Sequence, residues 1–321
     1  MDRILRRHII LLASAVLLLL VATLRPTVPV QRDIYSYLLV ADISQSMNTL
    51  DMSVNSKPAS RIAYTRKMLH DLIANMPCGT RVGMAFFAGA SVALQYSPIE
   101  VCENYAAIQD NIARMDWRMA WSGNSRLRQG ARSIAHLTRT LHEPSQVLFF
   151  TDGEEAPRLH AYNTLDLNGF QGGKGWLVIG IGSDKGTPIP KYDETNKLLG
   201  YWSAESFQMQ PGVAQISQEN FGARDDGVAM MDSSRQLSRL DEPYLQKYTA
   251  EIGADYVRGD SFPQVMATVQ QRNPSRHDIA PMQINVWLAA LAAILLLATF
   301  FSRTWFAMPG GRFKHLVGHH G

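Results

Sequence analysis

The sequence contains only two cysteines, Cys78 and Cys102. They do not form a C-x-x-C pair, which argues against a redox-active dithiol and against a zinc site. Two cysteines in an oxidising compartment suggest a disulfide. That bond would close a loop of about 25 residues and stabilise the fold by roughly 3 kcal/mol. The alternative is two separate buried thiols.

Basic residues are scarce outside the two ends of the chain. The net charge is +3, yet residues 1–25 contain four arginines against one aspartate, and residues 302–321 contain two arginines, one lysine and no acid. The middle of the chain therefore has a net charge of about −3. A mildly acidic middle lacks the basic patch that binds nucleic acid, so we do not expect a nucleic-acid partner.

Two apolar runs, Ile9–Leu24 and Val286–Phe301, lie next to these basic ends. A spanning helix needs about 20 mostly apolar residues, with roughly 17 as the minimum, so each run reaches this length only with its neighbours. The first run could instead be a signal peptide, although no clear small-x-small cleavage site follows it. The second run could be a buried core helix. We expect transmembrane helices over 9–25 and 284–301.

The basic residues beside the two runs predict how the chain crosses the membrane. Because positively charged flanks stay in the cytoplasm, residues 1–8 and the tail 302–321 are expected there. Residues 26–283 then lie on the other side, which is the periplasm if the protein comes from a bacterium. We therefore predict a bacterial inner-membrane protein with two spans.

Between the two runs, continuous apolar strands alternate with amphipathic helices. This order is typical of an α/β fold with a doubly wound, mostly parallel central sheet and helices on both faces. A tight connection at Gly89-Ala90 predicts one antiparallel edge. Strands are expected over 36–43, 81–89, 91–99, 146–152, 175–183 and 254–259, and helices over 61–76, 104–115, 125–141 and 242–253.

The boundaries of the predicted domain follow from composition. Residues 26–34 contain two prolines and read as a linker, the domain covers 35–262, and 263–283 is expected to be a second linker. Residues 184–240 are rich in small and polar residues and interrupt the alternation of strands and helices. An unstructured loop of that length is unusual inside a compact domain. We therefore interpret 184–240 as a hairpin with a flexible tip.

Polar oxygens follow two of the expected strands. Asp42, Ser44 and Ser46 come directly after the first strand, and Asp152 ends the strand of "LFFTDG". Ser125 lies at the start of a helix. Because ligands bind at the carboxyl ends of strands in such sheets, these five side chains could converge. The alternative is that they only cap turns and satisfy backbone groups.

Carboxylates and hydroxyls are hard oxygen donors, which suit Mg²⁺ above all, and also Mn²⁺ or Ca²⁺. The D-x-S-x-S pattern, the later hydroxyl and T-D-G resemble the metal-ion-dependent adhesion site (MIDAS) of von Willebrand factor A (VWA) domains. The resemblance covers about residues 35–260. It implies that Ser44 and Ser46 bind the ion directly, and Asp42 and Asp152 directly or through water. Ser125 stands where the family usually has Thr.

The same resemblance implies a function. In the family, an acidic side chain of a protein partner completes the coordination of the ion, so the domain binds and does not catalyse. The segments "GIGSDKGTPIPKYDE" and "LDEPYLQKYTAEIGADY" resemble membrane-anchored bacterial VWA proteins encoded near MoxR-type ATPases. Other VWA or accessory proteins are further possible partners. A metal-independent scaffold in a MoxR-associated membrane stress or assembly complex is the alternative.

A narrower resemblance rests on "DISQSMN", "PCGTRVG", "PIEVCENYAAI" and "DWRMAWSGNSRL". Together these segments are similar to the VWA accessory proteins of methanol dehydrogenase gene clusters, the MxaL type. That group is implicated in maturation of the periplasmic dehydrogenase, with calcium insertion as the proposed role. The resemblance thus implies a periplasmic dehydrogenase as a partner.

Several residues near the predicted site could face a partner. Trp117 and Trp121 could form an aromatic rim, since aromatic residues are enriched at interface hot spots, and core packing is the alternative. Glu154 could add negative potential there, but Glu154 and Glu155 are expected in a solvated turn. Asp51 is expected to be a surface acid, although it could approach the same face.

Patterns typical of enzymes are missing. The chain has no G-x-S-x-G elbow and no histidine placed as a base for Ser44 or Ser46. A phosphatase would need a second aspartate where Ser44 stands. The histidines at 136, 142 and 160 have no ligand-like spacing and are expected on a helix face or in loops. We therefore predict a protein that is not an enzyme.

Overall fold

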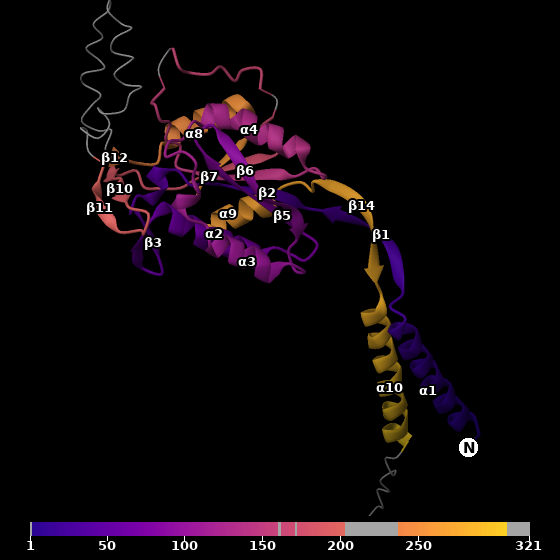
Figure 1. The fold of residues 1–321 in the computed structure, drawn as a ribbon. Helices are drawn as coiled ribbons and strands as arrows, with labels where there is room; N and C mark the ends of the chain where they lie inside the picture. The colour runs from indigo at the N-terminus through magenta and orange to yellow at the C-terminus, as the bar shows by residue number, and fades with distance from the viewer. Residues whose placement is uncertain (1, 160–161, 171, 203–236, 307–321) are drawn as a thin grey trace, which may run out of the picture. The chain divides into compact units, whose positions relative to one another are not determined.

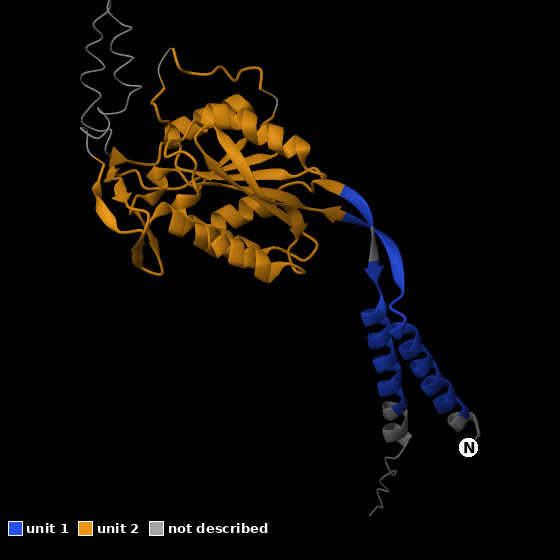
Figure 2. Ribbon diagram, viewed as in Figure 1, with its two compact units in different colours: residues 1–32, 277–321 blue, residues 33–276 orange. Residues whose placement is uncertain are grey.

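The computed structural model describes residues 2–159, 162–170, 172–202 and 237–306. The chain separates into two compact units, one formed by residues 33–276 and the other by residues 1–32 and 277–321 (Figure 2).

The larger unit is built on a six-stranded sheet with the order β13-β8-β7-β2-β5-β6. All neighbouring strands are parallel except β5 and β6, which form an antiparallel edge. This confirms the predicted α/β fold with a mostly parallel sheet. The strands are β2 (Ser36–Asp42), β5 (Arg81–Ala88), β6 (Ser91–Glu100), β7 (Gln146–Thr151), β8 (Trp176–Gly180) and β13 (Asp255–Arg258).

Helices cover both faces of this sheet (Figure 1). On the central strand, Leu39 and Ala41 point into the core under one set of helices, and Leu38 and Val40 into the core under the other. This alternation follows from the period of two in a strand. The first core lies against α2 (Arg61–Asn75), α3 (Tyr105–Ala113) and α9 (Phe262–Gln270), and the second against α4 (Leu127–Thr140) and α8 (Glu242–Ile252).

Local signals explain where the helices begin. The Ser60 hydroxyl accepts a hydrogen bond from the Ala63 N–H at 3.2 Å, as expected for an N-cap, and this fixes the first turn of α2. Asp241 caps α8 in the same way through the Tyr244 N–H, and Gly253 ends that helix with φ of 73°. Both helices therefore begin directly beside loops that leave the carboxyl end of the sheet.

The excursion 184–240 contains the predicted hairpin. β10 (Pro190–Tyr192) and β11 (Leu198–Tyr201) pair antiparallel, and β9 (Thr187–Pro188) pairs with β12 (Leu237–Ser238). The predicted flexible tip falls on residues 203–236, which lie outside the described residues. A further short hairpin follows the first strand, formed by β3 (Met52–Val54) and β4 (Lys57–Ala59).

The segment 263–283, expected as a linker, is structured. Val265 and Val269 of α9 are buried in the first core, so this segment belongs mostly to the domain. Pro263 does not prevent this helix, because proline is accepted in the first turn of a helix. β14 (Arg276–Gln283) follows and pairs with β1 (Thr27–Ile34), so the expected linker 26–34 is also a strand.

The smaller unit contains two helices that pack side by side, α1 (Asp2–Thr23) and α10 (Asn285–Phe306). Their less exposed residues recur at steps of three and four, which is the period of a helix–helix seam. Ala15 and Ala292 are both fully buried, and small residues of this kind let helix backbones approach closely. The seams comprise His8, Leu11, Ala15, Leu18 and Ala22 in α1, and Asn285, Leu288, Ala292, Leu295 and Thr299 in α10.

Of the described helices, α1 contains a stretch, Arg6–Thr23, that is long and apolar enough to cross a membrane. The apolar part of α10, Asn285–Thr299, is shorter. A membrane-spanning first segment agrees with this finding. The second span and the orientation of the chain stay predictions.

Candidate functional site

Asp42, the last residue of β2, lies at the carboxyl end of the sheet and is fully buried. Its Oδ1 accepts a hydrogen bond from the Ser44 N–H at 2.9 Å. Ser44 begins the short 3₁₀ helix η1 (Gln45–Asn48), which contains Ser46, and the two hydroxyl oxygens lie 3.4 Å apart. The loop after the first strand therefore turns these three oxygen-bearing side chains toward one region.

The second oxygen of Asp42 is approached from two other segments. Its Oδ2 accepts hydrogen bonds from the hydroxyls of Thr151 at 2.8 Å and Ser125 at 3.3 Å. Ser125 reaches this position because its neighbours Asn124 and Arg126 hydrogen-bond to the backbone of Gly89, just beyond β5. Three strand ends thus contribute to one polar cluster, as expected for the carboxyl edge of a parallel sheet.

Asp152 follows β7, the neighbour of β2 in the sheet, and is also fully buried. Its Oδ1 accepts the Glu154 N–H at 3.0 Å, and its Oδ2 accepts Nη1 of Arg61 at 2.8 Å. The turn needs Gly153, whose φ is 81°, and a Cβ there would lie 2.7 Å from the side chain of Leu245. The turn therefore carries Asp152 in one fixed orientation.

The electrostatics of the cluster disfavour the charged form of Asp42. Burial, together with the nearby negative charge of Asp152, raises the pKa of Asp42 to about 7, although hydrogen bonds from Ser44 and Thr151 act in the opposite direction. A buried carboxylate is stable in its charged form only when it is paired with a positive charge. A positive charge beside Asp42 would meet that requirement.

The five predicted ligands fit a divalent ion by their chemistry. Asp42, Ser44, Ser46, Ser125 and Asp152 are all buried and offer only oxygen atoms. Such a donor set suits Mg²⁺, Mn²⁺ or Ca²⁺ and does not suit the softer metals. Hydrogen bonds connect Asp42 with Ser44 and Ser125, and Asp42 and Asp152 interact electrostatically. The assignment of these residues as ligands stays a prediction.

Thr151 and Arg61 are parts of the site that sequence reasoning missed. Thr151 stood within the quoted "LFFTDG", and only the pairing of β7 with β2 reveals that its hydroxyl faces Asp42. Arg61 is the first residue of α2 and is fully buried. It pairs with Asp51, so the expectation that Asp51 is a surface acid was wrong: its side chain is 3% exposed.

The two glutamates after Asp152 are not in a solvated turn, which corrects that expectation. Burial and the charge of Asp152 raise the pKa of Glu154 to about 7, and its Oε1 accepts the Arg239 N–H at 3.1 Å. Glu155 accepts hydrogen bonds from the Tyr244 hydroxyl at 2.7 Å and the Arg128 N–H at 3.0 Å, while burial raises its pKa. Both carboxylates accept hydrogen bonds from donors of the protein in place of water. They therefore connect the turn to neighbouring segments.

The two tryptophans behave differently from one another. Trp117 packs against the core, and its Nε1 donates to Asn196 Oδ1 at 2.7 Å in the hairpin β10–β11. Trp121 is 47% exposed, as is Met119. A cavity of about 290 Å³ opens here, lined by Ile43, Gln45, Trp117, Arg118, Ala120, Ser122, Gly123 and Glu194. The cavity therefore borders both the Ser44–Ser46 loop and the hairpin.

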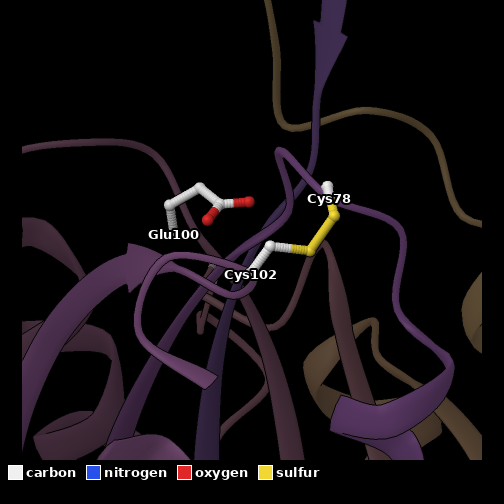
Figure 3. A group of neighbouring side chains, drawn as sticks. All are labelled: Cys78, Glu100 and Cys102. Atoms are coloured by element: carbon white, nitrogen blue, oxygen red, sulfur yellow. A yellow bond between two sulfur atoms is a disulfide. The ribbon is translucent and has the colours of Figure 1, made fainter. Parts of the chain in front are cut away.

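Cys78 and Cys102 form a disulfide with Cα atoms 5.3 Å apart, which confirms the predicted pair. Glu100 lies beside it (Figure 3), and its two carboxylate oxygens accept the Gly79 and Glu103 N–H groups. The sulfurs are bonded to each other and the carboxylate is taken by the backbone. This group therefore joins the turn before β5 to the turn before α3 and offers no free ligand set for a metal.

Two of the three histidines considered above, His136 and His142, lie in the described residues. His136 lies on α4 and His142 in the turn that follows it, as expected for helix-face or loop residues. His160 lies outside the described residues.

Residues 37–155 match the family model described as von Willebrand factor type A domain. The matched segment begins in β2 and ends three residues after Asp152, so it contains all five predicted ligands. It covers a little over a third of the chain and agrees with the α/β fold of the larger unit.

The comparison with solved structures matched two bacterial proteins, among others. One is an aerotolerance-related membrane protein from Bacteroides fragilis, with 18% identity over 74% of this chain and 97% of that chain and a TM-score of 0.46. The other is the conserved hypothetical protein BatB from Bacteroides thetaiotaomicron, with 17% identity over 74% of this chain and 96% of that chain and a TM-score of 0.49. No match is found among the curated proteins.

Proposed function

We propose that this protein is a membrane-tethered VWA domain that binds a protein partner through a divalent ion and is not an enzyme. The observation that carries the proposal is the buried oxygen cluster around Asp42 at the carboxyl edge of the sheet. The match of residues 37–155 to the VWA family supports it. A partner carboxylate would be the remaining ligand, and Mg²⁺ is the first candidate ion.

In this proposal Ser44 and Ser46 hold the ion directly, and Asp42, Ser125 and Asp152 hold it directly or through water. The ion, when bound, supplies a positive charge that attracts a carboxylate. The chain itself keeps the ligands in position, since Asp42 accepts three hydrogen bonds and Asp152 two. The segments that form the cluster, 42–46, 125 and 151–155, contain no histidine or lysine that could act as a base.

The partner surface that we propose surrounds this cluster. Trp121 and Met119 are exposed beside the cavity, and Leu50 is 44% exposed next to Asp51. Exposed apolar residues around a polar site are typical of protein-binding surfaces. Leu198 and Leu199 of the hairpin are also exposed, so the hairpin contributes to the same surface through its contact with Trp117.

The tether is the helix pair α1 and α10. We propose two spans, with both chain ends in the cytoplasm and residues 33–276 in the periplasm. The basic flanks support this orientation. The Cys78–Cys102 disulfide supports an oxidising compartment for the larger unit.

The process that this protein serves is proposed from sequence resemblance. The similarity to the MxaL type favours maturation of a periplasmic methanol dehydrogenase, with calcium insertion as one form of it. A MoxR-type ATPase system would be a further partner. In the second candidate function, the domain is a scaffold that needs no metal.

One experiment separates these two functions. Full-length wild type and Asp42→Ala are used to capture partners from membranes, with and without EDTA, and the partners are identified by mass spectrometry. The metal-bridged function would be supported if wild type captured a dehydrogenase or its accessory proteins in the absence of EDTA. Neither Asp42→Ala nor wild type in EDTA should then capture them. The same partners under all conditions would support the scaffold.

A direct measurement of the ion accompanies the capture. We expect calorimetric titration with Mg²⁺ or Mn²⁺ to give a binding isotherm for wild type and none for Asp42→Ala or Asp152→Ala, because each change removes a charged ligand. Circular dichroism controls for the fold. If both variants bound the ion as wild type does, the assignment of the site would be refuted.

A further inference from the structure

Arg61 occupies an unfavourable position unless other groups compensate its charge. It is fully buried, and it is the first residue of α2, where the helix dipole presents its positive end. A buried guanidinium in such a place requires carboxylate partners. Two buried or nearly buried aspartates, Asp51 and Asp152, meet this requirement.

The contacts of Arg61 fix its guanidinium group from several sides. Nε and Nη2 donate to the Asp51 carboxylate at 3.0 and 2.7 Å, and Nη1 donates to Asp152 Oδ2 at 2.8 Å and to the Ser238 hydroxyl at 2.7 Å. Asp51 in turn accepts the N–H and hydroxyl of Ser183. The guanidinium therefore cannot leave Asp152 without breaking the contacts of Asp51 as well.

The backbone leaves a place for this group. Gly182 has φ of 138°, and a Cβ at that position would lie 2.9 Å from Arg61 Nε. A glycine is thus needed both for the conformation of the chain and for the space that the guanidinium fills. This is a built arrangement at the side of Asp152.

We propose that Arg61 is the internal counter-charge of the metal site: it neutralises Asp152 when no ion is bound and thereby weakens the binding of the ion. The inference rests on the metal site proposed above. Arg61 compensates the Asp152 carboxylate, whereas the Asp42 carboxylate has only neutral donors. On its Asp152 side, a divalent ion would therefore meet the fixed positive charge of Arg61, which Asp51 and Asp152 share.

This arrangement has a consequence for partner binding. An ion whose binding is opposed by this guanidinium binds firmly only when another carboxylate completes its coordination. The partner's acidic residue supplies that carboxylate. Arg61 therefore couples occupancy of the metal site to the presence of the partner, and the free protein binds the ion weakly.

The test uses two variants with opposite expected effects on the full-length protein in detergent. Asp51→Asn removes a negative charge and keeps Arg61, so the dissociation constant for Mn²⁺ should rise. The double variant Asp51→Asn/Arg61→Gln removes both charges, and Arg61 is the charge that contacts Asp152. The double variant should bind Mn²⁺ at least about fivefold more tightly than wild type.

The double variant is used because Arg61→Gln alone would leave Asp51 buried without its partner and endanger the fold. Asp152 keeps its orientation in the double variant, since the Glu154 N–H still binds Oδ1. The matched control is Arg128→Gln/Glu251→Gln, a second mostly buried arginine–carboxylate pair, which does not contact a predicted ligand side chain. Its dissociation constant should equal that of wild type.

Calorimetry with Mn²⁺ and thermal unfolding with EDTA or Mn²⁺ are the two readouts. The melting temperature in EDTA should fall in the double variant, and Mn²⁺ should raise it by more than in wild type. Suppose that wild type binds Mn²⁺, Asp42→Ala does not, and the double variant binds no more tightly than wild type. The role of Arg61 is then refuted, while the proposed metal site stands. If wild type binds no Mn²⁺, the proposed metal site fails, and the inference fails with it.

Discussion

At the scale of single residues, the site depends on how each oxygen of two buried aspartates is satisfied. Asp42 receives only neutral donors, from Ser44, Ser125 and Thr151, whereas Asp152 receives a backbone N–H and a guanidinium. The two carboxylates thus differ in charge compensation, although both lie at the carboxyl ends of neighbouring parallel strands. In the proposed site, the charge of Asp42 is therefore left for the ion to compensate, whereas Arg61 already compensates Asp152.

Thr151→Val tests the support that a hydroxyl gives to Asp42. Valine has nearly the same shape but no donor, so Asp42 Oδ2 would keep only the longer bond from Ser125. We expect the free energy of unfolding at pH 8 to fall by about 1.5–3 kcal/mol, the usual contribution of a hydrogen bond to a charged group. Urea unfolding in EDTA measures it.

Thr138→Val is the matched control for this change. The Thr138 hydroxyl bonds carbonyls of its own helix, so its loss should change the free energy of unfolding by less than about 0.5 kcal/mol. Equal effects of the two substitutions would mean that the Thr151 hydroxyl has no special role at Asp42.

At the scale of elements, the site is assembled by loops that connect different parts of the sheet. The Ser44–Ser46 loop is held to the Ser125 loop by the hydrogen bond from Gln45 N to Gly123 O at 3.0 Å. α8 is joined to the loop 165–167 by Glu251, which accepts hydrogen bonds from Arg128 and the Leu167 N–H. These contacts join helices on one face of the sheet to loops that lead to the site.

The contact of Glu251 predicts a pH dependence of stability. Its hydrogen bond from Arg128 is the main reason that the pKa of Glu251 lies below the ordinary value of 4.5. A lowered pKa in the folded state means that the stabilisation is complete above pH 4.5 and is lost as the pH falls through the folded pKa. We expect Glu251→Gln to lower the free energy of unfolding by about 1–2 kcal/mol at pH 7.

Below about pH 4 the difference between Glu251→Gln and wild type should shrink, because the wild-type carboxylate becomes protonated. Denaturant unfolding between pH 3 and pH 7 checks this expectation. Asp110→Asn, in an exposed pair with Arg114, serves as the control and should have little effect at any pH. A Glu251→Gln difference that does not depend on pH would contradict the prediction.

At the scale of the whole molecule, the chain combines an α/β unit with a pair of apolar helices. Residues far apart in the sequence, 1–32 and 277–321, form one unit, while the α/β unit lies between them in the sequence. If both helices span a membrane, the unit that lies between them in the sequence is on one side of it.

Protease treatment tests this orientation. In spheroplasts of an expressing bacterium, we expect added protease to degrade the unit 33–276, while a tag after residue 321 remains protected until the membrane is permeabilised. Intact cells, in which the outer membrane excludes the protease, provide the control. A tag that is cut in spheroplasts would show that the second apolar helix does not return the chain to the cytoplasm.

The sequence by itself determined the α/β fold, the disulfide and the position of Asp42, Ser44 and Ser125, which hydrogen bonds connect. Period-two and period-3.6 patterns identify strands and helices locally, and polar residues that follow buried strands must gather at one edge of a parallel sheet. The disulfide was predictable because the chain offers only one pair of cysteines.

Only the tertiary structure decided how the charges in the site are balanced. Arg61 is ten residues from Asp51 but 91 from Asp152 and 177 from Ser238, and nothing in the local pattern indicates that it turns inward. The contact of the hairpin with Trp117 likewise joins residues 79 positions apart. Such contacts depend on which segments the sheet brings together, and a buried ion pair forms only where both partners lose water at the same place.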